Sequence, residues 1–230
     1  MYLYLLFIIK FSYNLIVVFM KFDLKKYVLL YTIGSFLGYL LETIFCFIKY
    51  NHYIIKKGMI FGPFKPLYGF GLIFIFLFYK YLKKKNKLFV FIAGILLGSI
   101  YEYSASLIET YILHTNSWDY SNFKYNLNGR IYLPYTILWG ILIVVCIFYL
   151  FPLFIKLYNY LNTYKFSNII LHLLTIFMIF NLILTSLVLI RFGLRNNNIA
   201  PLSPIGKMID TKYDNNYIKK TFPRLKPSLK

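Results

Sequence analysis

Residues Ile131–Phe151 read IYLPYTILWGILIVVCIFYLF, a run of 21 residues without a charged side chain. A helix needs about 20 apolar residues to cross the hydrocarbon of a bilayer, so this run is long enough to span a membrane. It is continuously apolar, whereas a strand of a membrane barrel would alternate apolar and polar residues. The run therefore predicts a transmembrane α-helix.

Four further apolar runs lie on either side of it. The chain of 230 residues is 60% hydrophobic and only 14% charged, and a soluble protein of this size could not bury so much apolar surface in one core. We therefore predict an all-α, polytopic transmembrane bundle with about five spans. The other four runs are Tyr27–Ile48, Leu67–Leu82, Leu88–Leu113 and Ser167–Ile190.

The segment 1–20 has two interpretations. Tyr2–Phe19 is apolar but contains Lys10 and Asn14, and a charge at a helix centre costs roughly 2.5–3.5 kcal/mol on insertion scales. Met20-Lys21 also resembles a bacterial start, so the segment is either an N-terminal apolar extension or a sixth, weaker span. We divide the remainder into a membrane domain with four spans and two polar loops (21–166), a fifth span (167–190) and a basic C-terminal tail (191–230).

The basic residues of the chain are placed where membrane proteins carry them. The net charge of +19 arises from 26 Lys and Arg against 7 Asp and Glu. The basic residues lie between the apolar runs and in the C-terminal tail, where Lys and Arg normally set topology and contact anionic head groups. We therefore expect the lipid bilayer, and not nucleic acid, to be the partner of this charge.

Two of the spans share a pattern that indicates an internal repeat. Both Gly34–Glu42 and Gly94–Glu102 read GxxxGxxxE, at a constant offset of 60 residues. Each copy is followed by a polar loop and by another apolar run that opens with Gly and Pro. This order predicts a parallel two-helix repeat about an axis along the membrane normal. The glycines concerned are Gly34, Gly38, Gly94 and Gly98.

Three acidic residues, Glu42, Glu102 and Glu109, fall inside predicted spans. Ionisable groups at that depth are costly and normally face a protein interior or a wet cavity. All three lie in the span halves nearer the loops 49–66 and 114–130, which a count of crossings places on one side of the membrane. We predict a polar site at this face. From the second loop it would include Trp118, Asp119, Asn126, Asn128 and Arg130.

A structural role is the alternative for these residues. The glutamates would then be protonated or bonded to neighbouring helices, and Asp119 with Arg130 would form a loop clasp. The loop 49–66 is rich in Gly, Pro and aromatic residues, so we expect it to lie in the interface or to dip back into the protein.

Motifs for cofactors do not occur in the sequence. There is no GxxxxGK[ST] P-loop, so this chain does not hydrolyse ATP through such a loop of its own. The two cysteines stand apart, and the three histidines have no spacing typical of metal ligands. We therefore predict no cofactor and no metal in this chain.

At the quoted residues the sequence resembles the bacterial family of ABC-transporter type IV permeases, from about Tyr27 to Pro152. The resemblance rests on GYLLET (Gly38–Thr43), GMIFGPFKPLYGFG (Gly58–Gly71), YEYSASLIE (Tyr101–Glu109) and WDYSNFKYNLNGRIYLPYTILWG (Trp118–Gly140). It implies a multi-pass protein of the bacterial cytoplasmic membrane that works with a separate ATP-binding subunit. The motif residues that carry over are Glu42, Gly62, Pro63, Pro66, Tyr68, Gly69, Glu102, Glu109, Trp118, Asp119, Tyr120, Asn126, Asn128, Gly129, Arg130, Trp139 and Gly140.

Three functions fit these features. The first is a transporter permease subunit that moves a small solute, with Arg130 pairing an anionic group and the three intramembrane glutamates handling a cation or protons. The second is a membrane-embedded enzyme acting on a lipid-linked or small polar substrate, with paired carboxylates as general acid and base. The third is a scaffold that binds other membrane proteins, or a second copy of itself, through its GxxxG faces.

Overall fold

The computed structural model describes residues 23–51 and 57–228, and within them the chain is mainly helical. The segment 1–20, predicted as an extension or a weak span, lies outside the described residues. The helices are α2 (Leu24–Tyr50), α3 (Pro66–Leu82), α4 (Lys87–Tyr111), α5 (Leu133–Val145), α6 (Phe151–Asn162), α7 (Lys165–Asn196), α8 (Pro204–Lys212) and α9 (Asn215–Thr221). Antiparallel pairs are formed by β1 (Thr115–Asn116) with β4 (Lys226–Pro227) and by β2 (Asn126–Leu127) with β3 (Ile131–Tyr132).

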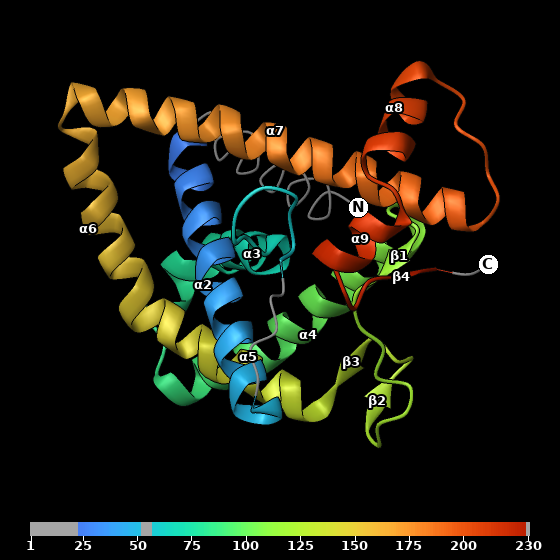
Figure 1. Ribbon diagram of the computed structural model, residues 1–230. Coiled ribbons are helices and arrows are strands. Elements are labelled where there is room, and N and C mark those ends of the chain that lie inside the picture. The colour runs from blue at the N-terminus through green and yellow to red at the C-terminus, as the bar shows by residue number, and fades with distance from the viewer. Residues whose placement is uncertain (1–22, 52–56, 229–230) are drawn as a thin grey trace, which may run out of the picture.

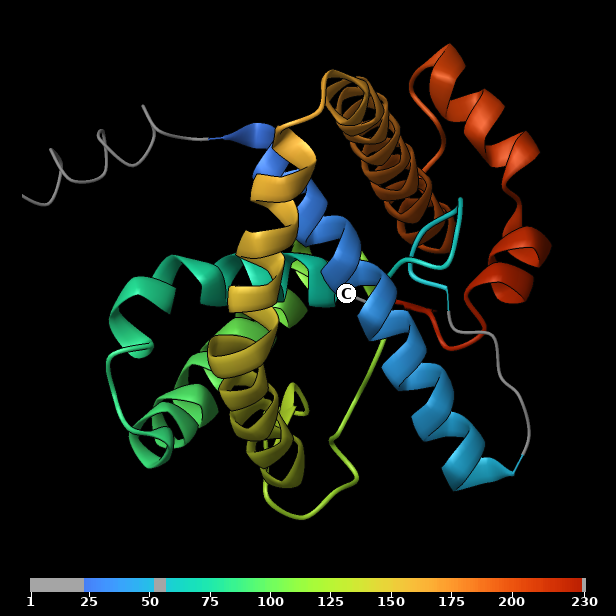
Figure 2. The same cartoon turned by 90° about the vertical axis from the view of Figure 1, so that its left-hand side faces the viewer.

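The predicted all-α membrane bundle is confirmed. Within the described part, α2, α4, the continuous helix α5–α6 and α7 are long and apolar enough to cross a bilayer, and α3 is a shorter apolar helix of 17 residues. In Figure 1, α7 runs across the upper end of α2 towards α8 and α9. Figure 2 shows α3 and α4 on one side of α2 and α6, and α7 with α8 and α9 on the other.

The fourth span is longer than predicted. Its predicted end was Phe151, whereas the helix continues through Pro152 to Asn162. A π-helical turn, Cys146–Leu150, precedes the proline, and the N–H of Phe151 donates to the carbonyl oxygen of Cys146. Proline lacks an N–H and clashes with the preceding turn of a regular helix, and this wider turn accommodates it.

The repeated glycines lie where two helix pairs pack closely. A Cβ atom on Gly38 of α2 would overlap the Tyr68 ring of α3, and one on Gly98 of α4 would overlap Trp139 of α5. Small residues at this spacing let two helices approach closely. The pairs α2–α3 and α4–α5 therefore pack as the predicted repeat requires. One turn earlier, Gly34 faces Leu72 and Gly94 faces Ile143.

The irregular segment Gly58–Lys65 is held against α7 by polar side chains. The N–H of Ile60 donates to Thr185 Oγ1 (3.1 Å), and that of Phe61 donates to Asn181 Oδ1 (3.2 Å). Asn181 is fully buried, and its Nδ2 donates back to the Phe61 carbonyl (2.7 Å). Irregular backbone at membrane depth requires such partners, because hydrocarbon offers none. In the described part of the predicted loop 49–66, Met59 and Ile60 are therefore buried in the protein.

The residues predicted as a basic tail fold into a compact unit on the end of α7. That helix continues past the predicted end at Ile190 to Asn196. Its buried Phe192 packs with Ile209 of α8 and with Ile218 of α9. Because these apolar residues are spread thinly among polar ones, the sequence showed no continuous run that would have indicated this small core. The unit also includes β4, which pairs with β1 beside the C-terminal end of α4.

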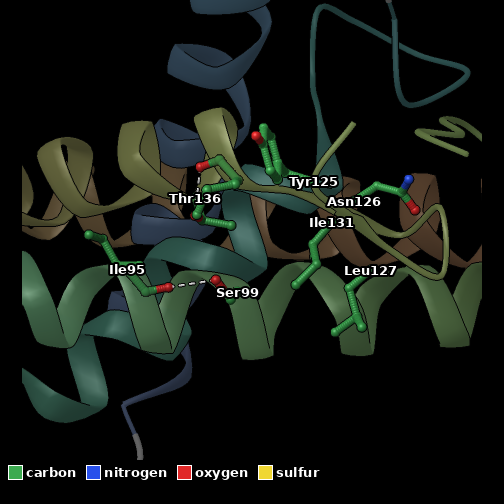
Figure 3. A pocket seen from close by; sticks show the side chains of 8 residues that line it. Ile95, Ser99, Tyr125, Asn126, Leu127, Ile131 and Thr136 are labelled. Atoms are coloured by element: carbon green, nitrogen blue, oxygen red, sulfur yellow. Dashed lines mark hydrogen bonds between the residues drawn. The ribbon is translucent and has the colours of Figure 1, made fainter. Parts of the chain in front are cut away.

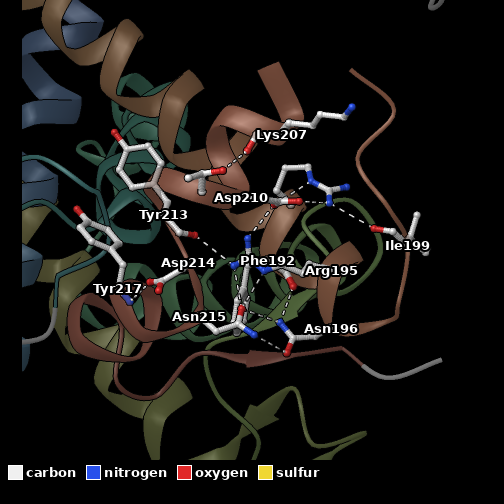
Figure 4. A network of polar contacts seen from close by, with 12 residues as sticks. Phe192, Arg195, Asn196, Ile199, Lys207, Asp210, Tyr213, Asp214, Asn215 and Tyr217 are labelled. Atoms are coloured by element: carbon white, nitrogen blue, oxygen red, sulfur yellow. Dashed lines mark hydrogen bonds and ion pairs between the residues drawn. The ribbon is translucent and has the colours of Figure 1, made fainter. Parts of the chain in front are cut away.

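A network of charged side chains joins the C-terminal unit to α7 (Figure 4). Asp210 accepts hydrogen bonds from Arg191 Nη2 at 2.5 Å and from Arg195 Nη1 at 2.8 Å. Arg195 also bonds Asn215 Oδ1 and the Tyr213 carbonyl oxygen. Burial opposes ionisation of Asp210, but the bonds and charges of the two arginines outweigh it and hold its pKa below the usual value.

This network gives the unit a pH dependence. The folded-state pKa of Asp210 lies below its unfolded value, so the carboxylate stabilises the unit above about pH 4 and ceases to do so as the pH falls. We expect Asp210→Asn to destabilise the unit at pH 7 by about 1–3 kcal/mol. Amide hydrogen exchange in residues 204–228 measures this loss.

The matched control is Asp214→Asn. Asp214 caps α9 through the N–H of Tyr217 (2.7 Å), and asparagine caps a helix about equally well. Exchange in this variant should therefore resemble that of the wild type. Equal protection in Asp210→Asn and Asp214→Asn would show that the arginine pair does not hold the unit.

Candidate functional site

Glu42 of α2 forms a partly buried ion pair with Lys65, the residue before α3. Its Oε2 accepts a hydrogen bond from Lys65 Nζ at 2.7 Å, and the two side chains are only 21% and 19% exposed. Lys65 is positioned by its own backbone, since its N–H donates to the carbonyl oxygen of Ser35 on α2 (2.9 Å) and α3 begins at the next residue, Pro66. The segment Gly58–Lys65 thus places a cation beside Glu42, the first glutamate of the repeat. The cation lowers the cost of the charge on Glu42.

Glu102 occupies the equivalent position in the second repeat, with neutral partners. It is 4% exposed and accepts hydrogen bonds from Trp139 Nε1 (2.9 Å) and from the Tyr120 hydroxyl (3.3 Å). Within residues 23–51 and 57–228, no Lys or Arg is paired with it. One glutamate of the repeat is therefore neutralised by a lysine, and the other is held by two neutral donors.

Glu42 and Glu102 share one neighbour, Tyr68, where the helix pairs meet. The rings of Tyr68 and Trp139 lie 5.7 Å apart at this junction, and Tyr68 interacts electrostatically with both Glu42 and Glu102. Burial and the charge of Glu102 raise the pKa of Tyr120 well above its ordinary value, so its hydroxyl remains a donor at physiological pH. We call these residues the polar centre: Glu42, Lys65, Tyr68, Glu102, Tyr120 and Trp139.

Glu109 lies two turns further along α4, outside the polar centre. Its carboxylate accepts hydrogen bonds from the N–H (2.9 Å) and the hydroxyl of Ser117, and it interacts with Lys65 only through the electrostatic field. The three intramembrane glutamates thus accept their hydrogen bonds from different residues. In the part of the chain that the structure describes, no three His, Cys, Asp or Glu side chains are grouped as metal ligands would be.

Asp119 and Asn126 hold the shape of the second loop. Asp119 Oδ1 accepts from the N–H and the hydroxyl of Ser121, and these bonds lower its pKa. Asn126 bonds the Phe123 carbonyl oxygen and the N–H of Gly129, which has a positive φ of 67°. Asp119 does not pair with Arg130, so the loop is closed by these local bonds and not by the ion-pair clasp that was the alternative.

Arg130 is anchored on α4 by hydroxyl groups. Its Nη1 donates to Ser106 Oγ (2.8 Å) and to Thr110 Oγ1 (2.9 Å), and its carbonyl oxygen accepts from Trp118 Nε1 (2.9 Å). Asn128 lies nearby and donates to the Tyr103 hydroxyl (3.0 Å). Trp118, Asn128 and Arg130 are therefore brought together, but at a place distinct from the polar centre.

Sequence reasoning missed Lys65 as a site residue, as well as the hydroxyls that anchor Arg130. Lys65 stands inside the quoted GPFKP motif, but basic residues in loops were assigned to topology. Ser106 follows Glu102 by four residues and Thr110 follows Ser106 by four, a spacing that places all three on one face of α4. That spacing was the pattern that could have identified the hydroxyls.

The fold and the polar centre together define a multi-pass α-helical membrane protein with polar chemistry between two helix pairs. The chain belongs to the family described as "Putative ABC-transporter type IV", whose sequence profile matches residues 29–186. The match covers all of the polar centre and ends within α7, before the C-terminal unit. No curated protein and no solved structure matches the chain. The apolar helices and the family support a membrane transporter-like protein.

Proposed function

We propose that this chain is the membrane subunit of an ABC transporter and that a small solute passes the polar centre. The observation that carries the proposal is that Glu42 and Glu102, at matching positions of the GxxxGxxxE pattern, both interact with Tyr68 at the junction of the two helix pairs. Transporters commonly place their sites between structural repeats. Because the chain has no P-loop, ATP hydrolysis would be supplied by a separate subunit.

The charges of the polar centre favour a cationic group or a proton. Lys65 neutralises Glu42, while Glu102 has only neutral donors, so the centre is negative when both carboxylates are ionised. A small cation would gain a carboxylate partner at Glu102, and a proton could reside there at little cost. The same environment also suits a general acid, which is the basis of the alternative function, a membrane-embedded enzyme.

We expect Glu102→Gln to lower transport about tenfold to hundredfold, because it removes a charged acceptor but keeps the side-chain shape. The measurement is mass spectrometry of small solutes in cells and medium, for a strain lacking the gene and for the same strain expressing each variant. The amount of at least one solute in cells or medium should change when the gene is deleted. Expression of the wild-type protein should return that amount to its original value.

Glu109→Gln is the matched control, since Glu109 lies on the same helix but bonds Ser117 outside the polar centre. It should restore the solute more fully than Glu102→Gln at equal protein levels. Full restoration by Glu102→Gln would remove the polar centre from the transport path. A change in a lipid pool without any change in a small solute would favour the enzyme.

A further inference from the structure

One stripe of α4 connects the membrane interior with Arg130. Its members are spaced by three or four residues, which places them on one helix face, and seven residues of helix span about 10 Å. Towards the middle of the span, Ile95 and Ser99 of the stripe line an apolar groove. Towards the polar loops, Ser106 and Thr110 carry the hydroxyls that anchor Arg130. The stripe consists of Ile95, Ser99, Tyr103, Ser106 and Thr110.

The groove lies between α4, the start of α5 and the hairpin β2–β3 (Figure 3). It has a volume of about 340 Å³. Exposed apolar side chains flank it on both helices, among them Leu96 on α4 and Ile137 on α5, so the groove faces the bilayer. Its lining is Ile95, Ser99, Tyr125, Asn126, Leu127, Ile131, Leu133 and Thr136.

The charge of Arg130 is not balanced by any carboxylate. All seven acidic residues lie in the described segments, and none of them is paired with Arg130. Its guanidinium group lies 5.9 Å from the ring centres of both Tyr103 and Tyr111, and Nη1 is bonded to the two α4 hydroxyls. Among the described residues no hydrogen bond occupies Nε or Nη2, which leaves donors for an anion.

We propose that this face binds one anionic phospholipid of the surrounding bilayer, with its phosphate on Arg130 and an acyl chain in the groove. Phosphate matches the fork of donors on a guanidinium group. The tyrosines beside Arg130 are typical of the depth at which head groups lie. Ser99 in the groove lies about two helical turns from Ser106, towards the bilayer centre. This site is separate from the polar centre and does not depend on its role in transport.

The test is native mass spectrometry of the full-length protein, purified in mild detergent with equal amounts of phosphatidylglycerol and phosphatidylcholine carrying the same acyl chains. We expect one phosphatidylglycerol to be retained per chain, with a preference of about tenfold over phosphatidylcholine. Arg130→Gln should abolish that preference. Ser99→Phe, which fills the groove, should lower retention of both lipids.

Two controls separate this site from general charge and from soluble phosphate. Lys207→Gln removes one exposed positive charge from α8, away from the groove and from Arg130, and it should retain lipid as the wild type does. Glycerol 3-phosphate at millimolar concentration should leave the lipid bound, because it has no chain for the groove. Displacement of the lipid by glycerol 3-phosphate would overturn the proposal in favour of a soluble phosphate site.

The proposal remains testable if Arg130→Gln does not yield folded protein. Arg130→Lys keeps the charge but loses the fork of donors, and it should reduce the preference for phosphatidylglycerol. Equal retention of the two lipids by the wild-type protein, or an unchanged preference in both Arg130 variants, would overturn the proposal.

Discussion

Asn181→Leu is expected to prevent stable assembly of the membrane domain. Leucine has a similar volume, but it cannot bond the N–H and the carbonyl oxygen of Phe61, which Asn181 bonds at 3.2 Å and 2.7 Å. These bonds are partly buried, and hydrocarbon offers no replacement partner, so we expect the loss of each to cost about 1–3 kcal/mol and of both about 2–6 kcal/mol. The measurement is thermal unfolding in detergent, together with the fraction of monodisperse protein after extraction.

The neighbouring Thr185 supplies the control for this prediction. Thr185→Ser keeps the hydroxyl that accepts from the N–H of Ile60, whereas Thr185→Val removes it and keeps the shape. We expect the serine variant to unfold close to the wild type and the valine variant to lose about 1–3 kcal/mol. If Asn181→Leu were extracted and unfolded like the wild type, the position of the segment Gly58–Lys65 would not depend on its hydrogen bonds to α7.

Gly98→Ala is expected to force α4 and α5 apart. The added Cβ would overlap Trp139, and overpacking of this kind typically costs about 1–3 kcal/mol. The shift would also lengthen the hydrogen bond from Trp139 Nε1 to Glu102, now 2.9 Å, so transport should fall together with stability. Thermal unfolding and the solute measurement described above report the two effects.

A double-mutant cycle identifies the cause of this loss. The atom nearest to the added Cβ would be Trp139 Cβ, at 2.5 Å, so the clash is absent only in a Trp139→Gly background. There Gly98→Ala should cost little beyond the cost of Trp139→Gly alone. Ser104 is exposed on the same helix, and Ser104→Ala controls for a general effect of substitution in α4. Simple additivity of Gly98→Ala and Trp139→Gly would contradict the close packing at this contact.

The sequence predicted the parts of the fold that depend on local composition. The continuous apolar run Ile131–Phe151 indicated a span by itself, and the spacing of Gly34 and Gly38, repeated at Gly94 and Gly98, indicated close helix contacts that the structure shows. These patterns follow from bilayer thickness and helix geometry alone. The observed burial of Glu42 (21% exposed side chain) and Glu102 (4% exposed) agrees with the expectation that intramembrane glutamates face the protein interior.

Features that depend on distant parts of the chain could not be predicted in this way. The pairing of Lys65 with Glu42 requires the loop to return beside Ser35, and the partners of that loop, Asn181 and Thr185, are about 120 residues further along the chain. The folding of the C-terminal unit likewise depends on Asp210 meeting arginines of α7. A single sequence contains each of these residues but does not say which of them come together.

The most direct test of the central claim is purification of the protein from native membranes in mild detergent, followed by mass spectrometry of the proteins that remain bound. We expect a P-loop ATPase subunit in stoichiometric amount, because the chain has no P-loop and its family is described as "Putative ABC-transporter type IV". Absence of any such ATPase across several gentle detergents would contradict the role of membrane subunit in an ABC transporter.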